Sequence, residues 1–199
     1  MLIAVKSGVV KISAPAKLNL FLEVLGKRPD GYHEIESLMC PISLCDTLEL
    51  HATTEPHVDL KVEIPVVHNP IKNDPAWDVP CGDCNLVHRA VMQVRKRLNV
   101  QTGCRIRLTK LIPAAAGLGG GSSDAASAVV AAMLAWDSWD RSLAAEICAE
   151  LGSDLNLFLG DENGIGLALA KGRGEDCKIH TNIQSAKKIQ GSGGRRRTE

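Results

Sequence analysis

Residues 111–124 constrain the fold of this chain more than any other stretch. They read Leu-Ile-Pro-Ala-Ala-Ala-Gly-Leu-Gly-Gly-Gly-Ser-Ser-Asp and lead directly into an alanine- and valine-rich run at 125–135. Four glycines within five residues permit left-handed backbone and a close approach to a ligand. Serine is a good N-cap, and the run that follows favours a helix. The stretch therefore predicts a strand, a glycine loop and the N-terminus of a helix.

The residues of this loop leave two interpretations open. A helix N-terminus offers free N–H groups and about half a positive charge, so it attracts phosphate. The alternative is a plain turn before a buried helix. No Lys-Ser/Thr pair follows Gly121, so the loop is not a P-loop, and its G-x-G-x-G spacing is not the dinucleotide-binding pattern. If it holds a triphosphate, Ser122 or Ser123 would offer a hydroxyl to phosphate or magnesium.

Composition excludes several classes of protein. The chain has 199 residues, 45% of them hydrophobic, which is ordinary for a globular protein. A net charge of zero gives no argument for nucleic acid or an anionic membrane, and no apolar run approaches the ~18 residues of a membrane span. Seven cysteines without a regular framework indicate reduced thiols, and the single pair Cys81 and Cys84 does not predict a zinc site. We therefore expect no resident metal and a cytoplasmic protein, or a plastid one in a plastid-bearing organism, although no transit peptide is evident.

The first long strand is predicted at residues 9–25. From Ala16 onward its side chains alternate between an apolar face and a more polar face, formed by Leu18, Leu20, Leu22 and Val24 on one side and by Lys17, Asn19, Phe21 and Glu23 on the other. The apolar flank predicts that the strand lies inside a sheet rather than at a free edge. Lys17 and Asn19 would then point to a specific place, and simple solvation is the alternative.

Hydrophobic periodicity places the other elements in an α+β domain. Strands are predicted at 35–44, 47–52, 58–64, 104–109 and 164–170, and helices at 85–98, 123–136, 142–151 and, shorter, from 153 to 159. Cys45 and Asp46 are expected to link two strands, and residues 65–80 form a proline-rich loop. The expected fold is a two-layer α+β domain, a mixed sheet covered on one side by helices, over residues 1–180. Residues 181–199 are basic and of low complexity, which predicts a disordered tail.

Two further places carry candidate functional residues. Tyr32, the one tyrosine of the chain, follows a turn and stands beside His33. Such a pair can stack on a flat heterocycle and hydrogen-bond to it, and a packed loop pair is the alternative. Ser153 and Asp154 precede the short helix, where a simple capping role is the alternative to a functional one.

Four segments together resemble the GHMP kinases, the superfamily of galactokinase, homoserine kinase and mevalonate kinase. They are residues 15–22 followed by 31–33, the glycine loop at 113–126, Gly152-Ser153-Asp154, and 172–175. They occur in the family's order across residues 13–176. The first two segments are most similar to the branch that phosphorylates 4-diphosphocytidyl-2-C-methyl-D-erythritol in the non-mevalonate isoprenoid pathway.

The resemblance implies a fold and a reaction. The fold would be the GHMP-kinase N-terminal domain, which is like domain 2 of ribosomal protein S5. The reaction would be transfer of a phosphoryl group from ATP, with Mg²⁺, to the 2-hydroxyl of this cytidine diphosphate methylerythritol. The partners would be that small molecule and ATP, with no nucleic acid and no membrane, and the oligomeric state stays open.

Each candidate residue takes a role from the same resemblance. Lys17 and Asp154 match the catalytic lysine and aspartate, and the hypothesis is that Asp154 accepts the hydroxyl proton while Lys17 stabilises the developing alkoxide. A structural ion pair is the alternative for these two. Asn19, Tyr32 and His33 match substrate-binding positions. The predicted ATP-binding residues are Asn85, Leu86 and Lys110 on the adenine side, and Pro113, Ala114, Ala115, Ala116, Gly117, Leu118, Gly119, Gly120, Gly121, Ser122 and Ser123 at the phosphates.

The sequence departs from the family pattern in two places. Asn156 stands where a proline is usual, and we expect this to alter the start of the helix rather than the chemistry. After Glu175 the match fades, and residues 191–193 are a faint echo of the family's third glycine motif. We therefore expect the second domain to be missing through truncation, a frameshift or a mis-called gene end. A non-catalytic fragment stays an alternative, as does a sister kinase for another small alcohol, against which residues 31–33 argue.

Overall fold

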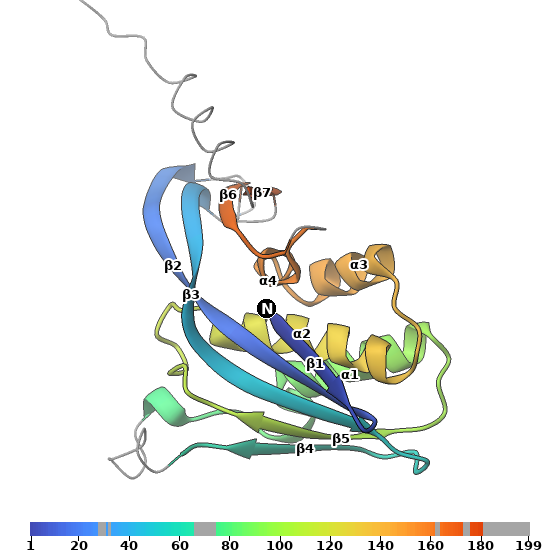
Figure 1. Cartoon of the computed structure of the whole chain (residues 1–199). Coiled ribbons are helices and arrows are strands. Elements are labelled where there is room, and N and C mark those ends of the chain that lie inside the picture. The colour runs from blue at the N-terminus through green and yellow to red at the C-terminus, as the bar shows by residue number, and fades with distance from the viewer. Residues whose placement is uncertain (28–30, 32, 66–74, 162–163, 173–175, 181–199) are drawn as a thin grey trace, which may run out of the picture.

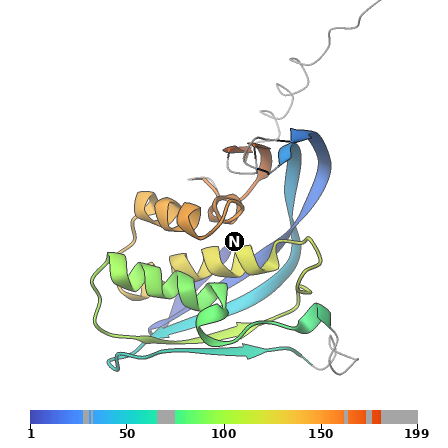
Figure 2. The same ribbon diagram turned by 180° about the vertical axis from the view of Figure 1, so that it is seen from behind.

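The computed structural model describes residues 1–27, 31, 33–65, 75–161, 164–172 and 176–180. Its strands form one mixed sheet in the order β1-β2-β3-β5-β4, and β6 lies beside β3 with β7 beside β6. Helices α1 and α2 lie in front of the strands when the molecule is seen from behind, and α3 packs on α1, α2 and α4 (Figure 2). The predicted two-layer α+β architecture is confirmed, and the tail predicted at 181–199 lies outside the described residues.

The bounds of the elements follow the predicted periodicity closely in most places. The strands are β1 (Leu2–Lys6), β2 (Val9–Lys27), β3 (His33–Ala52), β4 (Val58–Glu63), β5 (Cys104–Thr109), β6 (Leu167–Gly172) and β7 (Asp176–His180). The helices are α1 (Leu86–Arg97), α2 (Gly120–Ala135), α3 (Arg141–Leu151) and α4 (Leu155–Leu159), with 3-10 turns η2 (Pro75–Trp77) and η3 (Gly82–Cys84). The strand predicted at 164–170 begins later, β1 and β7 were not predicted, and η2 lies within the predicted loop. Residues 66–74 of that loop are outside the described part.

The core lies between helix α2 and the buried side chains of strands β2, β3 and β5, which form the inner part of the sheet (Figure 1). Helix α2 packs on β2 and β3 and also contacts α1, α3 and α4. Its side chains from Ser123 to Met133 are all buried, as expected of a helix that is covered on every side. Ile12 and Leu48 from the sheet and Val91 from α1 are fully buried against it. Burial of small alanines lets these layers approach closely and fixes α2 across the sheet.

The prediction of two strands joined at Cys45-Asp46 is wrong. Strand β3 is continuous, because Cys45 and Asp46 stay paired with Pro15 and Ala14 of β2. The irregularity comes just beyond, where the register between β2 and β3 shifts after Pro15. The polar Asp46, taken as a sign of a turn, is instead satisfied inside the structure.

The prediction that the first long strand lies inside the sheet holds for only part of its length. Strand β1 pairs with β2 over residues 9–13, and from Lys17 onward β2 pairs with β3 alone among the described strands. The outer segment, residues 18–27, is therefore a sheet edge. Its apolar face is exposed, and Leu20 is 59% exposed.

Helix α2 begins three residues earlier than predicted, and no serine caps it. Its N-cap is Gly119, which has a left-handed backbone (φ 69°) and no side chain to make a capping bond. Glycine permits this conformation, so the helix can start inside the glycine run. Ser122 and Ser123 thereby lie in the first turn of α2 rather than ahead of it.

Candidate nucleotide and phosphoryl-transfer site

The glycine loop lies between strand β2 and helix α4. A Cβ atom on Gly119 would stand 2.8 Å from Phe158 Cζ and 3.1 Å from Lys17 Cγ, so only glycine fits without displacing them. The backbone N–H of Lys17 donates to the carbonyl oxygen of Leu118 at 2.9 Å. Three segments far apart in the sequence therefore meet at the N-terminus of α2.

Lys17 is held in place by a polar chain along β2 and β3. Its side chain is buried, and Nζ donates to Asn19 Oδ1. Asn19 Nδ2 donates to Ser37 Oγ at 2.9 Å, and that hydroxyl donates to the carbonyl oxygen of Phe21 at 2.8 Å. Simple solvation is thus the wrong interpretation for Lys17, because its ammonium is fixed beside the glycine loop.

Asp154 stands at the N-terminus of α4 without capping it. Its side chain makes no capping hydrogen bond, and Oδ1 accepts from Ser153 Oγ at 3.1 Å. Phe158, one helical turn later, is the residue that packs against Gly119. Lys17 and Asp154 are not an ion pair within the described part of the chain. The structure therefore favours neither the cap nor the ion-pair alternative, and the carboxylate is half-buried near the loop.

A cavity of about 230 Å³ joins the predicted adenine-side residues to the glycine loop. Asn85, Leu86 and Lys110 line it together with loop residues Ala114, Ala115 and Gly121, and apolar walls come from Val79, Pro80, Val87 and Leu108. Two larger hollows lie elsewhere, of about 440 Å³ over β4 and β5 and about 340 Å³ beside β1. The smaller cavity combines apolar walls with a few polar groups, which is typical of a ligand site.

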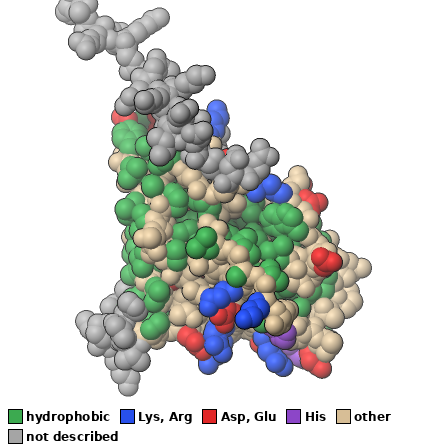
Figure 3. Space-filling model, viewed as in Figure 1, with side chains coloured by type: hydrophobic (Ala, Val, Ile, Leu, Met, Phe, Trp, Pro, Cys, Tyr) green, Lys and Arg blue, Asp and Glu red, His purple; other side chains and the backbone are tan. Residues whose placement is uncertain are grey.

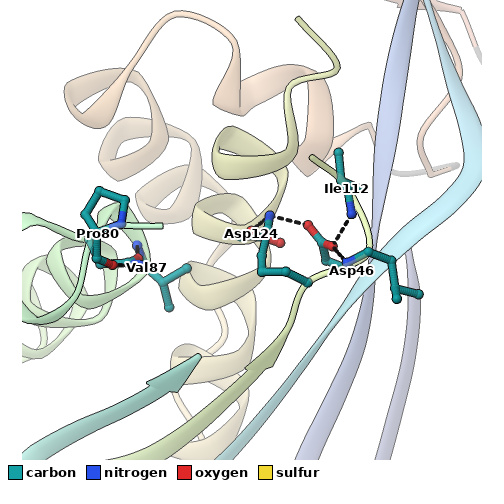
Figure 4. Close-up of polar contacts among 8 residues, drawn as sticks. Asp46, Pro80, Val87, Ile112 and Asp124 are labelled. Atoms are coloured by element: carbon teal, nitrogen blue, oxygen red, sulfur yellow. Dashed lines mark hydrogen bonds and ion pairs between the residues drawn. The ribbon is translucent and has the colours of Figure 1, made fainter. Parts of the chain in front are cut away.

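Asn85 closes one side of this cavity and is the N-cap of α1. Its Oδ1 accepts the backbone N–H of Val87 at 2.8 Å, and its Nδ2 donates to the carbonyl oxygen of Pro80 at 2.7 Å (Figure 4). An N-cap of this kind satisfies one of the free donors of the helix. Both polar groups of Asn85 are therefore used to shape the wall of the cavity.

Lys110, at the end of β5, carries its charge into the core. It is 3% exposed, and its ammonium binds Asp46 of β3 and, at 2.6 Å, Asp124 of α2. Asp46 Oδ1 also accepts the backbone N–H groups of Leu111 at 2.5 Å and Ile112 at 2.8 Å (Figure 4). The cluster joins a strand, the start of the glycine loop and the first turns of α2.

Burial and charge act in opposite directions on these groups. Burial alone would lower the pKa of Lys110, but the carboxylates of Asp124 and Asp46 raise it above its ordinary value. Burial raises the pKa of Asp124 to about 8, against the opposing effect of the Lys110 charge. Lys110 therefore stays charged at neutral pH, and the cluster holds a proton more firmly than separate carboxylates would.

Sequence reasoning missed Asp46 and Asp124. Strands β3 and β5 are antiparallel and paired up to Thr47 and Thr109, so Asp46 and Lys110 come next in the register. The strand register would have indicated that Asp46 lies opposite Lys110, and no local sequence pattern reveals that register.

Of the predicted substrate residues that the structure describes, Asn19 and His33 lie at different places along the outer segment. Asn19 contacts Lys17, but His33 is exposed at the start of β3, opposite Lys27 and at the far end of the outer segment. Tyr32 lies outside the described residues. The predicted pairing of Tyr32 and His33 on a heterocycle therefore stays a prediction.

No group of three or more His, Cys, Asp or Glu side chains gathers as a metal site within the described residues. Nor is any described helix both long and apolar enough to cross a membrane. The hydroxyl of Ser123, in the first turn of α2, is buried and has no hydrogen-bond partner.

Comparison with known proteins finds similar sequences and structures. Residues 85–170 match the GHMP kinases N terminal domain. The chain is 44% identical over 168 residues to the 4-diphosphocytidyl-2-C-methyl-D-erythritol kinase of Pelotomaculum thermopropionicum, covering 84% of this chain and 53% of that protein. The kinase of the same name from Bacillus subtilis is 42% identical over 166 residues, covering 83% and 52%. The chain thus spans about half the length of the curated relatives it matches.

Solved structures agree with these sequence relatives. A crystal structure of 4-(cytidine 5'-diphospho)-2C-methyl-D-erythritol kinase matches with a TM-score of 0.64 and 34% identity, over 85% of this chain and 55% of that one. Homoserine kinase from Cytophaga hutchinsonii matches with a TM-score of 0.60 at 15% identity, over 95% and 62%. The second likeness concerns the fold alone.

Proposed function

Because residues 85–170 match the GHMP kinases N terminal domain, we propose that the chain serves the ATP-dependent phosphorylation of the 2-hydroxyl of 4-diphosphocytidyl-2-C-methyl-D-erythritol. The observation that supports this most is the meeting of β2, the glycine loop and α4 at Gly119. It puts the side chain of Lys17 and the helix that follows Asp154 next to the N-terminus of α2.

ATP would occupy the cavity between Asn85 and the glycine loop. The apolar walls fit a base. The first intrahelical hydrogen bond of α2 runs from Ser123 N–H to the carbonyl oxygen of Gly119, so the N–H groups that precede Ser123 in the helix can bind phosphates. Mg²⁺ is usually held by substrate phosphates and few protein ligands. Bound with the nucleotide, it would neutralise part of the phosphate charge. The unpartnered hydroxyl of Ser123 fits such a role, and its neighbour Ser122 is the other candidate.

The chain's own residues would position and deprotonate the acceptor. Phosphoryl transfer needs chiefly alignment and neutralisation of charge, and Lys17 supplies a fixed positive charge beside the loop. Asp154 would accept the proton of the attacking hydroxyl. Asn19 holds the Lys17 ammonium and is the predicted contact to the substrate.

A coupled assay of ADP release tests the proposal. ADP should form with ATP and the cytidyl substrate together, and far more slowly with ATP alone or with another small alcohol. Asp154→Asn should lower turnover by about 10²- to 10⁴-fold, as loss of a general base does. Asp137→Asn is the matched control, because Asp137 is exposed with a left-handed backbone (φ 50°) that asparagine tolerates.

Two results would overturn parts of this proposal. Turnover by Asp154→Asn within about threefold of the unaltered protein would exclude the role as base. Nucleotide binding without ADP release would favour a non-catalytic nucleotide-binding protein.

A further inference from the structure

Asp46 is the residue on which the start of the glycine loop converges. Its Oδ1 accepts from the backbone N–H groups of Leu111 and Ile112, and its Oδ2 accepts from Lys110 Nζ. The side chain is fully buried, so each lost bond would leave an unpaired charge or donor in the core. One carboxylate thus fixes three consecutive residues.

The residues held by Asp46 lie directly beneath the first residue of α2. A Cβ atom on Gly120 would stand 2.9 Å from Ile112 Cγ2 and 3.3 Å from Lys110 Nζ. Since no space separates them, a shift of Ile112 or Lys110 must move the N-terminus of α2. The position of Asp46 is thereby transmitted to the N–H groups that face the proposed phosphates.

Asp46 also stands where β2 leaves the inner sheet. It pairs with Ala14, two residues before the register shift, and Lys17 then bonds through its backbone to Leu118. The loop is therefore held at its start by β3, through Asp46, and near its end by β2, through Lys17. The two attachments together fix the spacing between the Lys17 side chain and α2.

We propose that Asp46 is a positioning residue of the triphosphate site. It occupies the N–H groups of Leu111 and Ile112, so the phosphates are left to the later N–H groups at the start of α2, and it fixes those groups relative to Lys17. This inference rests on the proposed function, because it concerns the same nucleotide. Asp46 itself does not contact the ligand.

The test compares ATP with adenosine in calorimetric binding to the 199-residue protein. Asp46→Asn keeps one oxygen for the backbone donors, but its amide cannot accept from Lys110. We expect ATP to bind about tenfold more weakly or worse, and adenosine to stay within about threefold, since adenosine does not use the phosphate groups. Asp140→Asn is the matched control, because this exposed aspartate bonds a backbone N–H (Leu143, 3.0 Å) far from the cavity.

A second variant covers the case in which Asp46→Asn does not fold. Gly120→Ala disturbs the same contact from the opposite side, through its Cβ against Ile112, and should also weaken ATP more than adenosine. Equal losses for the two ligands, or unchanged ATP binding by either folded variant, would overturn the inference alone. Failure of the unaltered protein to bind ATP would overturn the proposed function and the inference with it.

Discussion

The inner and outer parts of strand β2 follow the same alternating pattern but have opposite surroundings. In the inner part, Val10, Ile12 and Ala14 are buried between the sheet and α2, whereas in the outer part Leu18 and Leu22 are 43% and 55% exposed. The apolar side chains of the outer part contribute to the hydrophobic surface seen in Figure 3. Alternation therefore identifies a strand, and the neighbouring elements decide whether its apolar face becomes core.

The boundary between the two parts carries the candidate chemistry. Lys17 is the last buried residue of β2, and its neighbours beyond are exposed. A side chain there is held by the rigid inner sheet and still reaches an open surface. This combination of a firm base and an accessible edge is what a positioned functional group needs.

The largest expected difference concerns stability. Ile12→Ala should lower the free energy of unfolding by about 2–5 kcal/mol, because Ile12 is fully buried and the change leaves a cavity. Leu22→Ala, its matched control in the outer part, should cost less than about 1 kcal/mol. Urea unfolding of the two variants measures both. Similar losses would mean that the outer part is covered in solution.

The next largest difference between the inner and outer parts is expected in the reactivity of their cysteine thiols. Burial raises the pKa of Cys104, in the inner sheet, to about 12, whereas Cys40 lies opposite Leu18 in the outer part and is only partly buried. Native alkylation followed by peptide mass spectrometry should show Cys40 reacting at least about a hundredfold faster, since the accessible thiolate is the reactive form. In urea the two rates should converge. Equal rates in the folded protein would contradict the burial of β5.

A smaller effect is expected from pH on the buried charges of the inner region. The pKa of Asp124 is raised from its ordinary value of about 4 to about 8 in the folded protein, so folding favours its protonated form. Its contribution to stability therefore falls as pH rises from about 4 to about 8. Asp124→Asn, which has no proton to lose, should become progressively more stable relative to the unaltered protein as the pH rises from 5 to 8. Urea unfolding at the two values measures this, and a constant or falling difference would refute it.

The smallest effect belongs to the exposed face of the outer part. Leu20→Thr with Leu22→Thr should change the free energy of unfolding by less than about 0.5 kcal/mol, since both side chains are more than half exposed and threonine suits a strand. Binding of a hydrophobic dye should fall in the same variant. Unchanged dye binding would show that the dye reports on another surface.

Local patterns predicted most of the fold. Periodicity located the four helices and the long strands, because burial of one face imposes the repeat of each element. It missed β1 and the continuity of β3, since pairing with β2 decides both and depends on residues distant in the sequence. The prediction of a serine N-cap was wrong for a local reason. Gly119 adopts a left-handed backbone and is itself the N-cap, so the helix begins before the serines.

The candidate site was predicted less evenly than the fold. Motifs identified the glycine loop, Lys17 and Asp154, and the roles of these residues stay predictions. Asp46 belongs to no motif, and its pairing with Lys110 becomes visible only once β3 and β5 are in register. Asp124 lies within the glycine-loop motif, but its contact with Lys110 is seen only in the folded chain. Residues that bind a ligand can be recognised by their residue type within a motif. Residues that hold those ligand-binding residues in place are recognised only from the pairing of strands in the fold.

The hydrogen bond from Lys17 to Leu118 makes one backbone amide a reporter of the loop. The N–H of Lys17 is protected only while Leu118 stays packed against β2. Hydrogen exchange of this N–H should therefore report the opening of the loop rather than the unfolding of the strand. Exchange at this single amide, with and without nucleotide, would give the free energy of seating the loop directly.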